Sequence, residues 1–444
     1  MIGIEEKIRL EVKDRKLFSD IVVTEKGTSG DLKEKDYSEP EWRYILAVNI
    51  FREKLGLLTQ EELKSLAVFI NQKCVVIFLA TPSFDDAFRL FTIVNDRGKQ
   101  LRRIDILKAL NIAPDIITSP PVRSQIAQQW ETIEKDLGSD VFENVFYLLR
   151  LILLRDKPKG DLLKEFEQRI FAEPKLLQKG APFFDTVFEY SKLYEAIFID
   201  RDFVQDTLPE YSRFRSLIHI MDSNFEASEW RACLLAYAEH FGSTEFYRFC
   251  LQIEKVYLSQ WVNAVRKDER FSDYAAILTS IANAKKKRIK KPDVVFTVIE
   301  GMYDLDEIKS AVMRSNFYTA GFSKYILLRF ELVTSEHDAV HEFSAKSVEH
   351  VLPQKPDPKS DWAKEHKLEE ISSYVDSIGN LVLLSKSKNS GAKNFDFKKK
   401  KEKYLQTRVS DYPRSVQVLG YNDWTKQIIE TRTKEAGDLV LQDP

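Results

Sequence analysis

A long stretch of helical periodicity constrains this chain more than any other feature of its sequence. Between about Arg123 and Phe330, apolar residues recur at spacings of three and four in segments such as IAQQWETIEKDLG, VFYLLRLILLR and EWRACLLAYAEHFG. That spacing places apolar side chains on one face of a helix, which must be buried against other helices. Only 15 Gly and 15 Pro occur in 444 residues, so few tight turns interrupt the helices. We therefore predict a mainly α protein with a helical bundle at its centre.

The length of the chain predicts more than one domain. A single hydrophobic core rarely grows beyond roughly 250–300 residues, and this chain has 444. The segment 112–122 contains three prolines, which interrupt helices. After the helical stretch, short β-branched runs replace the long periodic segments. We predict a front domain at 1–111, a helical middle domain at 122–333 and a C-terminal domain at 334–444.

The front domain combines two kinds of signal. Residues 44–55 and 60–71 show helical spacing, and a further helix is expected to begin at about Asp105. Residues 16–23 and 75–79 are short apolar runs that predict strands or buried turns. The front is therefore expected to have an α+β fold within a chain that is mainly α.

Composition limits the classes of protein to which the chain can belong. Its 67 Lys and Arg against 69 Asp and Glu give a formal net charge of −2, so any surface that binds nucleic acid must be local. No apolar run approaches the ~18 residues of a membrane span. The first residues are charged throughout and contain no apolar leader segment. We expect a cytoplasmic protein without a membrane partner, and the sequence does not indicate its oligomeric state.

The three cysteines are Cys74, Cys233 and Cys250, which lie far apart and form no Cys-x-x-Cys pair. Neither a zinc site nor a disulfide framework is therefore expected. We predict that all three are small buried apolar side chains.

Three segments near the end of the chain carry recognisable chemistry: SVEHVLPQ, SIGNLVLL and SKSKNSGAKNFDFKKKKEKY. Together they place His350 beside Glu349, then Asn380, then Asn389, and then a basic helix. Each feature alone carries little information, because single histidines and Glu-His pairs are common. Histidine is the side chain suited to taking a proton from water near pH 7. The combination therefore predicts hydrolysis of a phosphodiester.

Phosphodiester hydrolysis also requires a divalent cation, which neutralises charge on the phosphate and the leaving oxygen. Hard cations prefer oxygen ligands. Glu349 and Asn389 offer a carboxylate and an amide carbonyl, and two protein ligands suffice because water and phosphate oxygens complete the shell. Mg²⁺ is the expected metal, with Mn²⁺ as the alternative.

The elements expected around these residues are short. If Glu349 and His350 lie on a strand, their side chains point to opposite faces. They can serve one site only if the strand ends or twists there, which Pro353 favours. The expected order is strand, long loop, strand, helix, at 347–352, 374–384 and 395–404.

These segments resemble the HNH, or His-Me finger, nucleases, whose fold is a ββα-metal motif. The HNH domain of RNA-guided DNA endonucleases has a similar layout. The likeness is strongest to the C-terminal domain of GmrSD-type modification-dependent restriction enzymes. Their pattern is Ile/Val-Glu-His-Ile-x-Pro-Gln, then Ile-Gly-Asn-Leu-x-Leu-Leu, an Asn-rich turn and Phe-x-x-Lys-Lys-x-x-Tyr. The matching parts of this chain are 348–354, 378–384, Asn389 with Asn394, and 397–404.

The resemblance implies a role for each matching residue. His350 would be the general base, Glu349 and Asn389 would hold the metal, and Asn380 would brace the loop and orient His350. A simple turn residue is the alternative for Asn380. Asn394 would be a secondary ligand, with an Asx turn or the N-cap of the following helix as the alternative.

Local charge supports an interaction with phosphate. Residues 385–408 contain nine Lys or Arg and two Asp or Glu, a local charge of +7. A basic surface beside a metal site suits a phosphate backbone. A second basic run, 285–291, has no such motif beside it and is interpreted as a solvated helix end or linker. The residues expected to contact nucleic acid are Gln354, Lys386, Lys388, Lys393, Lys398 and Lys399.

The front of the chain also resembles GmrSD-type proteins, whose N-terminal domain is related to ParB/sulfiredoxin-like folds. The family pattern Phe-x-x-(Ile/Val)-Asn-x-Arg-Gly-x-x-Leu matches here from Phe91 to Leu101. The family's Asp-Gly-Gln-Gln-Arg nucleotide motif does not occur in this sequence. The front is therefore expected to be truncated, or completed by a missing N-terminal segment or a partner chain. NTP hydrolysis is not expected of this chain alone, and Asn95, Arg97 and Gly98 would line a vestigial nucleotide pocket or form only a turn.

We therefore predict a metal-dependent DNA endonuclease of a prokaryotic anti-phage restriction system, in which the front and middle regions sense or gate. A non-catalytic nucleic-acid-binding subunit that needs a partner chain is one alternative. A ribonuclease that uses the same site is another.

Overall fold

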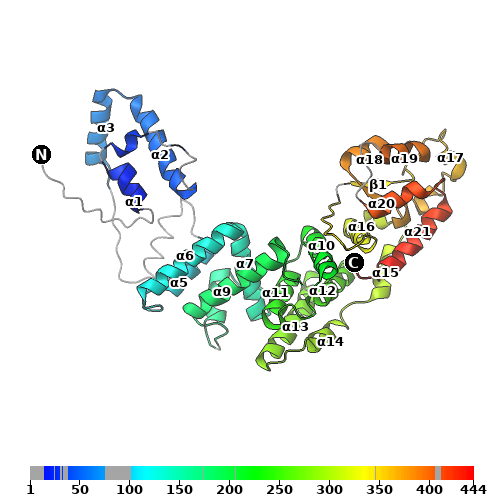
Figure 1. The fold of residues 1–444 in the computed structure, drawn as a ribbon, viewed down its shortest axis with the longest axis horizontal. Helices are drawn as coiled ribbons and strands as arrows, with labels where there is room; N and C mark the ends of the chain where they lie inside the picture. Colours follow the sequence, from blue (N-terminus) through cyan, green and yellow to red (C-terminus); the bar gives the residue numbers. More distant parts are fainter. Residues whose placement is uncertain are drawn as a thin grey trace. The chain divides into compact units, whose positions relative to one another are not determined.

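The computed structural model describes residues 15–24, 26–30, 33, 39–75, 102–173, 175–205, 207–345, 347–405 and 412–444 (Figure 1). The chain forms two compact units, Met1–Gln100 and Leu101–Pro444. Most of the described residues are helical, so the prediction of a mainly α protein is confirmed.

The described part of the first unit is helical. Its elements are α1 (Arg15–Phe18), the π-helical turn η1 (Ser19–Val23), the 3-10 turn η2 (Gly27–Ser29), α2 (Glu39–Gly56) and α3 (Gln60–Lys73). The helices predicted at 44–55 and 60–71 are thus confirmed. Helix α3 begins with a capping box, in which Thr59 and Glu62 each bond the backbone N–H of the other.

Of the two alternatives predicted for 16–23, a strand or a buried turn, the strand is wrong, because this segment is helical. Leu17 and Ile21 lie four residues apart, which puts both side chains on one face of a helical turn, and they pack with Ile45 and Val48 of α2. A run this short fits both the two-residue repeat of a strand and the 3.6-residue repeat of a helix, and packing against α2 favours the helix. Of the run predicted at 75–79, only the first residue lies within the described part of the chain.

The second unit begins with a large helical region. A helix begins at Arg103, close to the predicted position. The elements of this region are α5 (Arg103–Ile112), α6 (Pro120–Leu137), α7 (Ser139–Leu154), α8 (Leu162–Glu165), η5 (Phe166–Ile170), α9 (Ala181–Tyr194), η6 (Glu195–Ile199), α10 (Leu208–Asn224), α11 (Glu229–Phe241), α12 (Phe246–Val262), α13 (Lys267–Lys286), α14 (Asp293–Ile299), α15 (Leu305–Val312), η7 (Phe317–Thr319) and α16 (Ser323–Val333).

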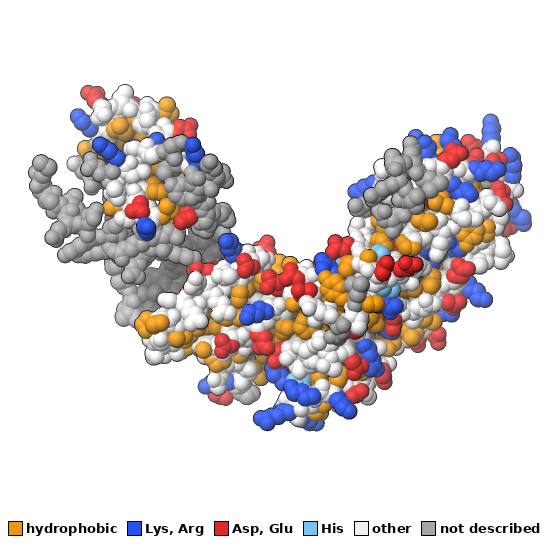
Figure 2. Space-filling view, in the orientation of Figure 1, with side chains coloured by type: hydrophobic (Ala, Val, Ile, Leu, Met, Phe, Trp, Pro, Cys, Tyr) orange, Lys and Arg blue, Asp and Glu red, His pale blue; other side chains and the backbone are white. Residues whose placement is uncertain are grey.

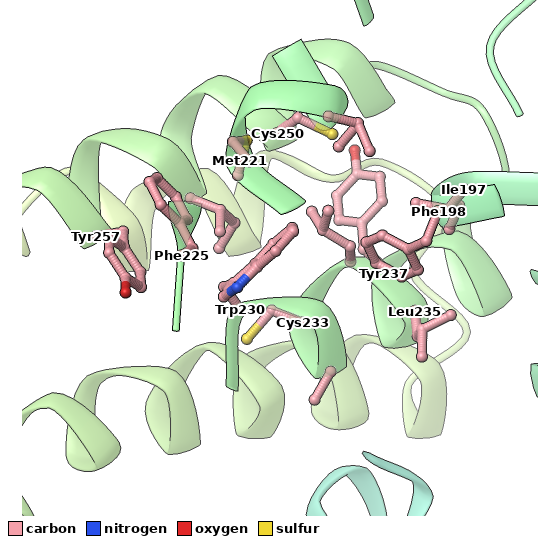
Figure 3. Packing of buried hydrophobic residues seen from close by; sticks show 14 of the residues in the cluster. Ile197, Phe198, Met221, Phe225, Trp230, Cys233, Leu235, Tyr237, Cys250 and Tyr257 are labelled. Carbon is pink, nitrogen blue, oxygen red and sulfur yellow. The ribbon is translucent and has the colours of Figure 1, made fainter. Parts of the chain in front are cut away.

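Many aromatic side chains lie in the core of this region (Figure 3). Trp230 of α11 contacts Phe198 and Phe225 edge-on, with ring centroids 5.6 and 5.7 Å apart. Phe225 also stacks on Tyr257 at 3.7 Å. Each such pair adds about 0.5–1.5 kcal/mol beyond the burial of apolar area. Rigid helix packing in this region therefore follows from its many aromatic residues.

The prediction of three buried cysteines is correct for two of them. Cys233 and Cys250 lie in the core, and burial raises the pKa of both thiols. Cys74 is exposed, so the prediction is wrong there. It directly follows α3, a helix without a buried residue among those described.

The last hundred residues of the second unit form a small sheet surrounded by short helices. Strand β1 (Ser347–His350) pairs antiparallel with β2 (Leu381–Leu384), so that Ser347 lies opposite Leu384 and His350 opposite Leu381. The other elements are α17 (Trp362–Glu365), η8 (Ile371–Ser373), η9 (Ile378–Asn380), α18 (Lys386–Ala392), α19 (Phe397–Leu405), α20 (Pro413–Gln417), η10 (Val418–Gly420) and α21 (Lys426–Leu439).

Both strands are shorter than predicted. The ladder ends at His350, and Pro353 soon follows, which cannot donate a ladder hydrogen bond. The predicted arm 374–384 forms a strand only in its last four residues. Its earlier part is taken up by turns that pack against α21 instead of pairing with β1.

A close approach of backbones joins α21 to the segment before β2. Gly379 donates its N–H to Thr433 Oγ1 at 3.2 Å, and its carbonyl accepts from Arg432 Nε at 3.0 Å. A Cβ at position 379 would lie 2.0 Å from the carbonyl oxygen of Ile429. Glycine is therefore required at this contact, which positions the start of β2.

Replacement of Gly379 by alanine is expected to destabilise the second unit by about 1–3 kcal/mol or more, because the new methyl group overlaps backbone that cannot easily move. Thermal and denaturant unfolding would measure this loss. Gly391→Ala is the control, since α18 offers open space at that position and alanine favours a helix by about 0.5–1 kcal/mol. Equal stability of the two variants would contradict the packing argument.

Candidate active site

The end of β1 and the helices α18 and α19 enclose a cleft of about 320 Å³. Glu349 and His350 both contribute to its wall although they are neighbours on a strand. This is possible because the strand ends at His350 and the chain turns immediately afterwards. The residues that line the cleft are Val348, Glu349, His350, Pro353, Gln354, Lys355, Asn389, Lys393, Asn394 and Lys400.

The imidazole of His350 is held by groups that the sequence did not single out. Its Nε2 lies 2.8 Å from Oδ1 of Asp376. The ring of Tyr318 meets the imidazole edge-on, with the centroids 4.4 Å apart. Burial lowers the pKa of His350, and the hydrogen bond to Asp376 opposes this shift. Burial therefore favours the neutral imidazole, the form that can accept a proton.

Glu349 is buried and forms an ion pair with Lys400. The Lys400 Nζ lies 2.6 Å from Glu349 Oε1 and donates to the carbonyl of His350 at the same distance. The hydroxyl of Tyr404 donates to the same carboxylate oxygen at 3.0 Å. Burial raises the pKa of Glu349, while Lys400 opposes the shift. Burial also lowers the pKa of Lys400.

Asn380 lies in the interior behind the cleft. Its Oδ1 accepts from the backbone N–H of Leu352 at 2.8 Å and from Trp424 Nε1 at 2.9 Å. Its Nδ2 donates to the carbonyls of Leu352 and Val375 at 2.9 and 2.7 Å. The two bonds to Leu352 therefore tie the segment after His350 to the turn before β2, and the other two connect that turn to Trp424 and Val375.

Asn389 faces the cleft from α18. Its Nδ2 donates to Ser347 Oγ and to the carbonyl of Val348. Asn394 also lines the cleft, where its Nδ2 donates to the carbonyl of Lys355 at 3.0 Å. Helix α19 begins at Phe397, so Asn394 does not occupy the N-cap position that the sequence suggested as an alternative.

The donor set suits a hard divalent cation. Both hydrogen bonds that described residues make to Glu349 end on Oε1, and both bonds of Asn389 come from Nδ2. Glu349 Oε2 and Asn389 Oδ1 therefore remain as oxygen donors on the cleft wall. Within the described ranges, no three His, Cys, Asp or Glu side chains gather closely enough to hold a metal by themselves. A cation here would take two protein oxygens and draw its other ligands from water and substrate.

The predicted nucleic-acid contacts fall into two groups. Gln354 and Lys393 line the cleft, and the Gln354 amide donates to Asp376 Oδ1 at 2.7 Å. The others do not line the cleft. Basic and acidic side chains lie interspersed on the surface of the part that carries the C-terminal helices (Figure 2). These others are Lys386, Lys398 and Lys399, which are exposed, and Lys388, whose Nζ donates to the carbonyl of Tyr404.

Sequence reasoning gave no role to four side chains of this site, which are Tyr318, Asp376, Lys400 and Tyr404. Lys400 and Tyr404 stand at the Lys and Tyr positions of the Phe-x-x-Lys-Lys-x-x-Tyr pattern matched above. A signal for two of them was present, since Phe397, Lys400 and Tyr404 share one helix face by their spacing. Lys400 therefore had to point inward although its neighbours Lys398 and Lys399 are exposed. Nothing in the local sequence marks Asp376 or Tyr318. The proposed pocket residues Asn95, Arg97 and Gly98 lie outside the described residues.

Two family models match the chain. The model of the C-terminal domain of GmrSD restriction endonucleases matches residues 303–437, and the model of their N-terminal domain matches residues 3–112. Together the matches cover more than half of the chain and define a restriction endonuclease with domains at both ends. The chain belongs to the GmrSD family, so the resemblance inferred from its motifs is confirmed. No curated protein matches the chain.

Among the described residues, no helix is both long enough and apolar enough to cross a membrane.

Breaking the buried ion pair is expected to destabilise the second unit. In Lys400→Met, the Glu349 carboxylate stays buried without its cation, which costs about 3–5 kcal/mol. The double variant Glu349→Gln/Lys400→Met removes the unpaired buried charge and is expected to recover more than half of the stability lost in Lys400→Met. Unfolding midpoints of the three proteins would measure both effects.

Lys399→Met is the matched control, because Lys399 neighbours Lys400 on α19 but is exposed. It is expected to change stability by no more than about 0.5 kcal/mol. An equally small effect of Lys400→Met would show that the pair does not stabilise the fold.

Proposed function

We propose that this chain is a metal-dependent DNA endonuclease of a prokaryotic anti-phage restriction system, with an HNH-type ββα-metal site in the cleft at the end of β1. The observation that carries the proposal is that one cleft brings Glu349 and His350 at the end of β1 together with Asn389 of α18. Two antiparallel strands followed by helices frame it, which is the element order of that motif. Membership in a restriction endonuclease family supports the same substrate class.

His350 acts as the general base in this proposal. Its Nε2 is engaged by Asp376, so Nδ1 is the ring nitrogen left for a water molecule. As the water oxygen attacks phosphorus and the P–O3′ bond breaks, the imidazole takes the water proton. Glu349 and Asn389 would hold Mg²⁺ or Mn²⁺, which when bound stabilises negative charge on the phosphate and the leaving oxygen.

Lysines in and outside the cleft bind and position the substrate. Lys393 offers a cation at the cleft wall, and Lys398 and Lys399 present two more from α19. Such contacts fix the phosphate backbone and carry no base specificity. Asn380 keeps the residues after His350 in place without touching the cleft.

We assign the three regions separate roles. The helical segment 122–333 and the front 1–111 have a sensing or gating role, and 334–444 performs the phosphodiester hydrolysis. The family match begins at residue 303 and so includes α15, η7 and α16.

His350→Ala is expected to lower plasmid cleavage by about 10²–10⁴-fold, because the general base is lost. Wild-type cleavage should require Mg²⁺ or Mn²⁺ and stop in EDTA. His341→Ala is the matched control, since His341 lies outside the cleft. Circular dichroism and unfolding midpoints would verify that both variants fold. Full cleavage by a folded His350→Ala protein would refute the proposed site.

Cleavage of DNA is expected to exceed cleavage of RNA of equal length and sequence. Binding to either should weaken with salt, with a slope that reports the number of phosphates contacted. Lys398→Ala/Lys399→Ala should reduce that slope by about two for duplex DNA, one for each lost cation. Faster RNA cleavage would instead identify a ribonuclease. Salt-dependent binding without cleavage under any metal would identify a subunit that only binds.

A further inference from the structure

Asp376 lies in the turn between η8 and η9, and its carboxylate faces His350. Oδ1 accepts two hydrogen bonds, from His350 Nε2 at 2.8 Å and from the Gln354 amide at 2.7 Å. The side chain is 23% exposed and that of His350 is 12% exposed. The pair is thus partly withdrawn from solvent, where its hydrogen bond is stronger than at the surface.

The contact determines which ring nitrogen of His350 carries the proton. An ionised carboxylate can only accept hydrogen bonds, so the hydrogen of this short contact must lie on Nε2. In the neutral ring Nδ1 then has the free lone pair. Nδ1 forms no hydrogen bond with the described residues, nor is it among their fully buried unpartnered atoms. Nδ1 is therefore the ring nitrogen left accessible, on a side chain that lines the cleft.

Tyr318 holds both members of this pair. Its backbone N–H donates to the carbonyl of Asp376 at 2.9 Å, and its ring packs edge-on against the imidazole of His350 at 4.4 Å. Tyr318 belongs to η7, and its neighbour Phe317 is anchored in the core at 1% exposure. A residue from the helical region, ahead of both strands, therefore completes the site.

We propose that Asp376 is the positioning residue of this site, which fixes His350 as the Nε2–H tautomer with Nδ1 towards the cleft, and that Tyr318 holds the pair in register. The tautomer assignment stands on the hydrogen bonds alone, whereas its catalytic consequence rests on the proposed nuclease function. A histidine base whose ring orientation is fixed is already aligned with the attacking water, so no rotational entropy is lost in aligning it during the reaction. Loss of an orienting carboxylate behind a histidine base costs up to about 10⁴ in rate in serine proteases.

The tautomer can be measured without any cleavage assay. The full chain is labelled with ¹⁵N-histidine, and its six histidines are recorded at a pH where the rings are neutral. His350→Gln identifies the signals of His350. We expect the Nε2–H pattern in the wild type and its loss or averaging in Asp376→Ala. An Nδ1–H pattern in the wild type, or an unchanged pattern in Asp376→Ala, would overturn the proposal.

Kinetics then test the catalytic consequence. Asp376→Ala is expected to lower kcat by about 10²–10⁴-fold with KM changed less than about threefold, because Asp376 aligns the base and does not hold substrate. Asp376→Glu should recover part of the rate. Asp423→Asn is the control, an exposed aspartate of the same region that does not line the cleft.

Tyr318 is tested by the same two readouts. Tyr318→Ala should lower kcat about tenfold or more and broaden the His350 signals, and Tyr318→Phe should restore both because it keeps the ring. Wild-type kcat in a folded Asp376→Ala protein would overturn the positioning role. A further outcome is that the wild type cleaves no substrate while its His350 shows the Nε2–H pattern and Asp376→Ala loses that pattern. In that case the nuclease proposal fails and the assignment of Asp376 stands.

Discussion

The geometry of this site depends on the buried side chain of Asn380. Its side-chain carbonyl accepts a hydrogen bond from the backbone N–H of Leu352, and its side-chain NH2 donates to the backbone carbonyls of Leu352 and Val375. Leu352 lies two residues after His350, and Val375 directly precedes Asp376. One side chain thus fixes the distance between the two loops that carry the imidazole and its carboxylate partner. Buried amides of this kind hold position well because any movement would leave a polar group unsatisfied.

Two further constraints act on the same loops from outside. Lys400 holds Glu349 and the carbonyl of His350 from α19, so the end of β1 is fixed from the side of the basic helix. Gly379 allows α21 to approach the turn before β2, and Tyr318 reaches the His350–Asp376 pair from the helical region. The site is therefore built from segments that span more than a hundred residues. Helical elements outside the two strands therefore contribute to the geometry of this site.

Much of the architecture could be predicted from the sequence. The helices at 44–55 and 60–71 and the mainly α class follow from periodicity, and the family follows from motif spacing. At 16–23, where a strand or a buried turn was predicted, the strand is wrong because a short apolar run fits both periods and the packing of Leu17 and Ile21 on α2 favours the helix. The exposed Cys74 shows the same limit, since burial is not a property of residue type alone.

For the candidate site, the sequence by itself determined which chemical groups are present: an imidazole, a carboxylate and two amides at fixed spacings along the chain. Only the tertiary structure decided how they are held. Asp376 and Tyr318 carry no local signal, because their contacts to His350 join segments far apart in sequence. Lys400 differs from its neighbours Lys398 and Lys399 only in the face of the helix that it occupies. Spacing along a chain specifies chemistry, but orientation and burial arise only when distant segments pack together.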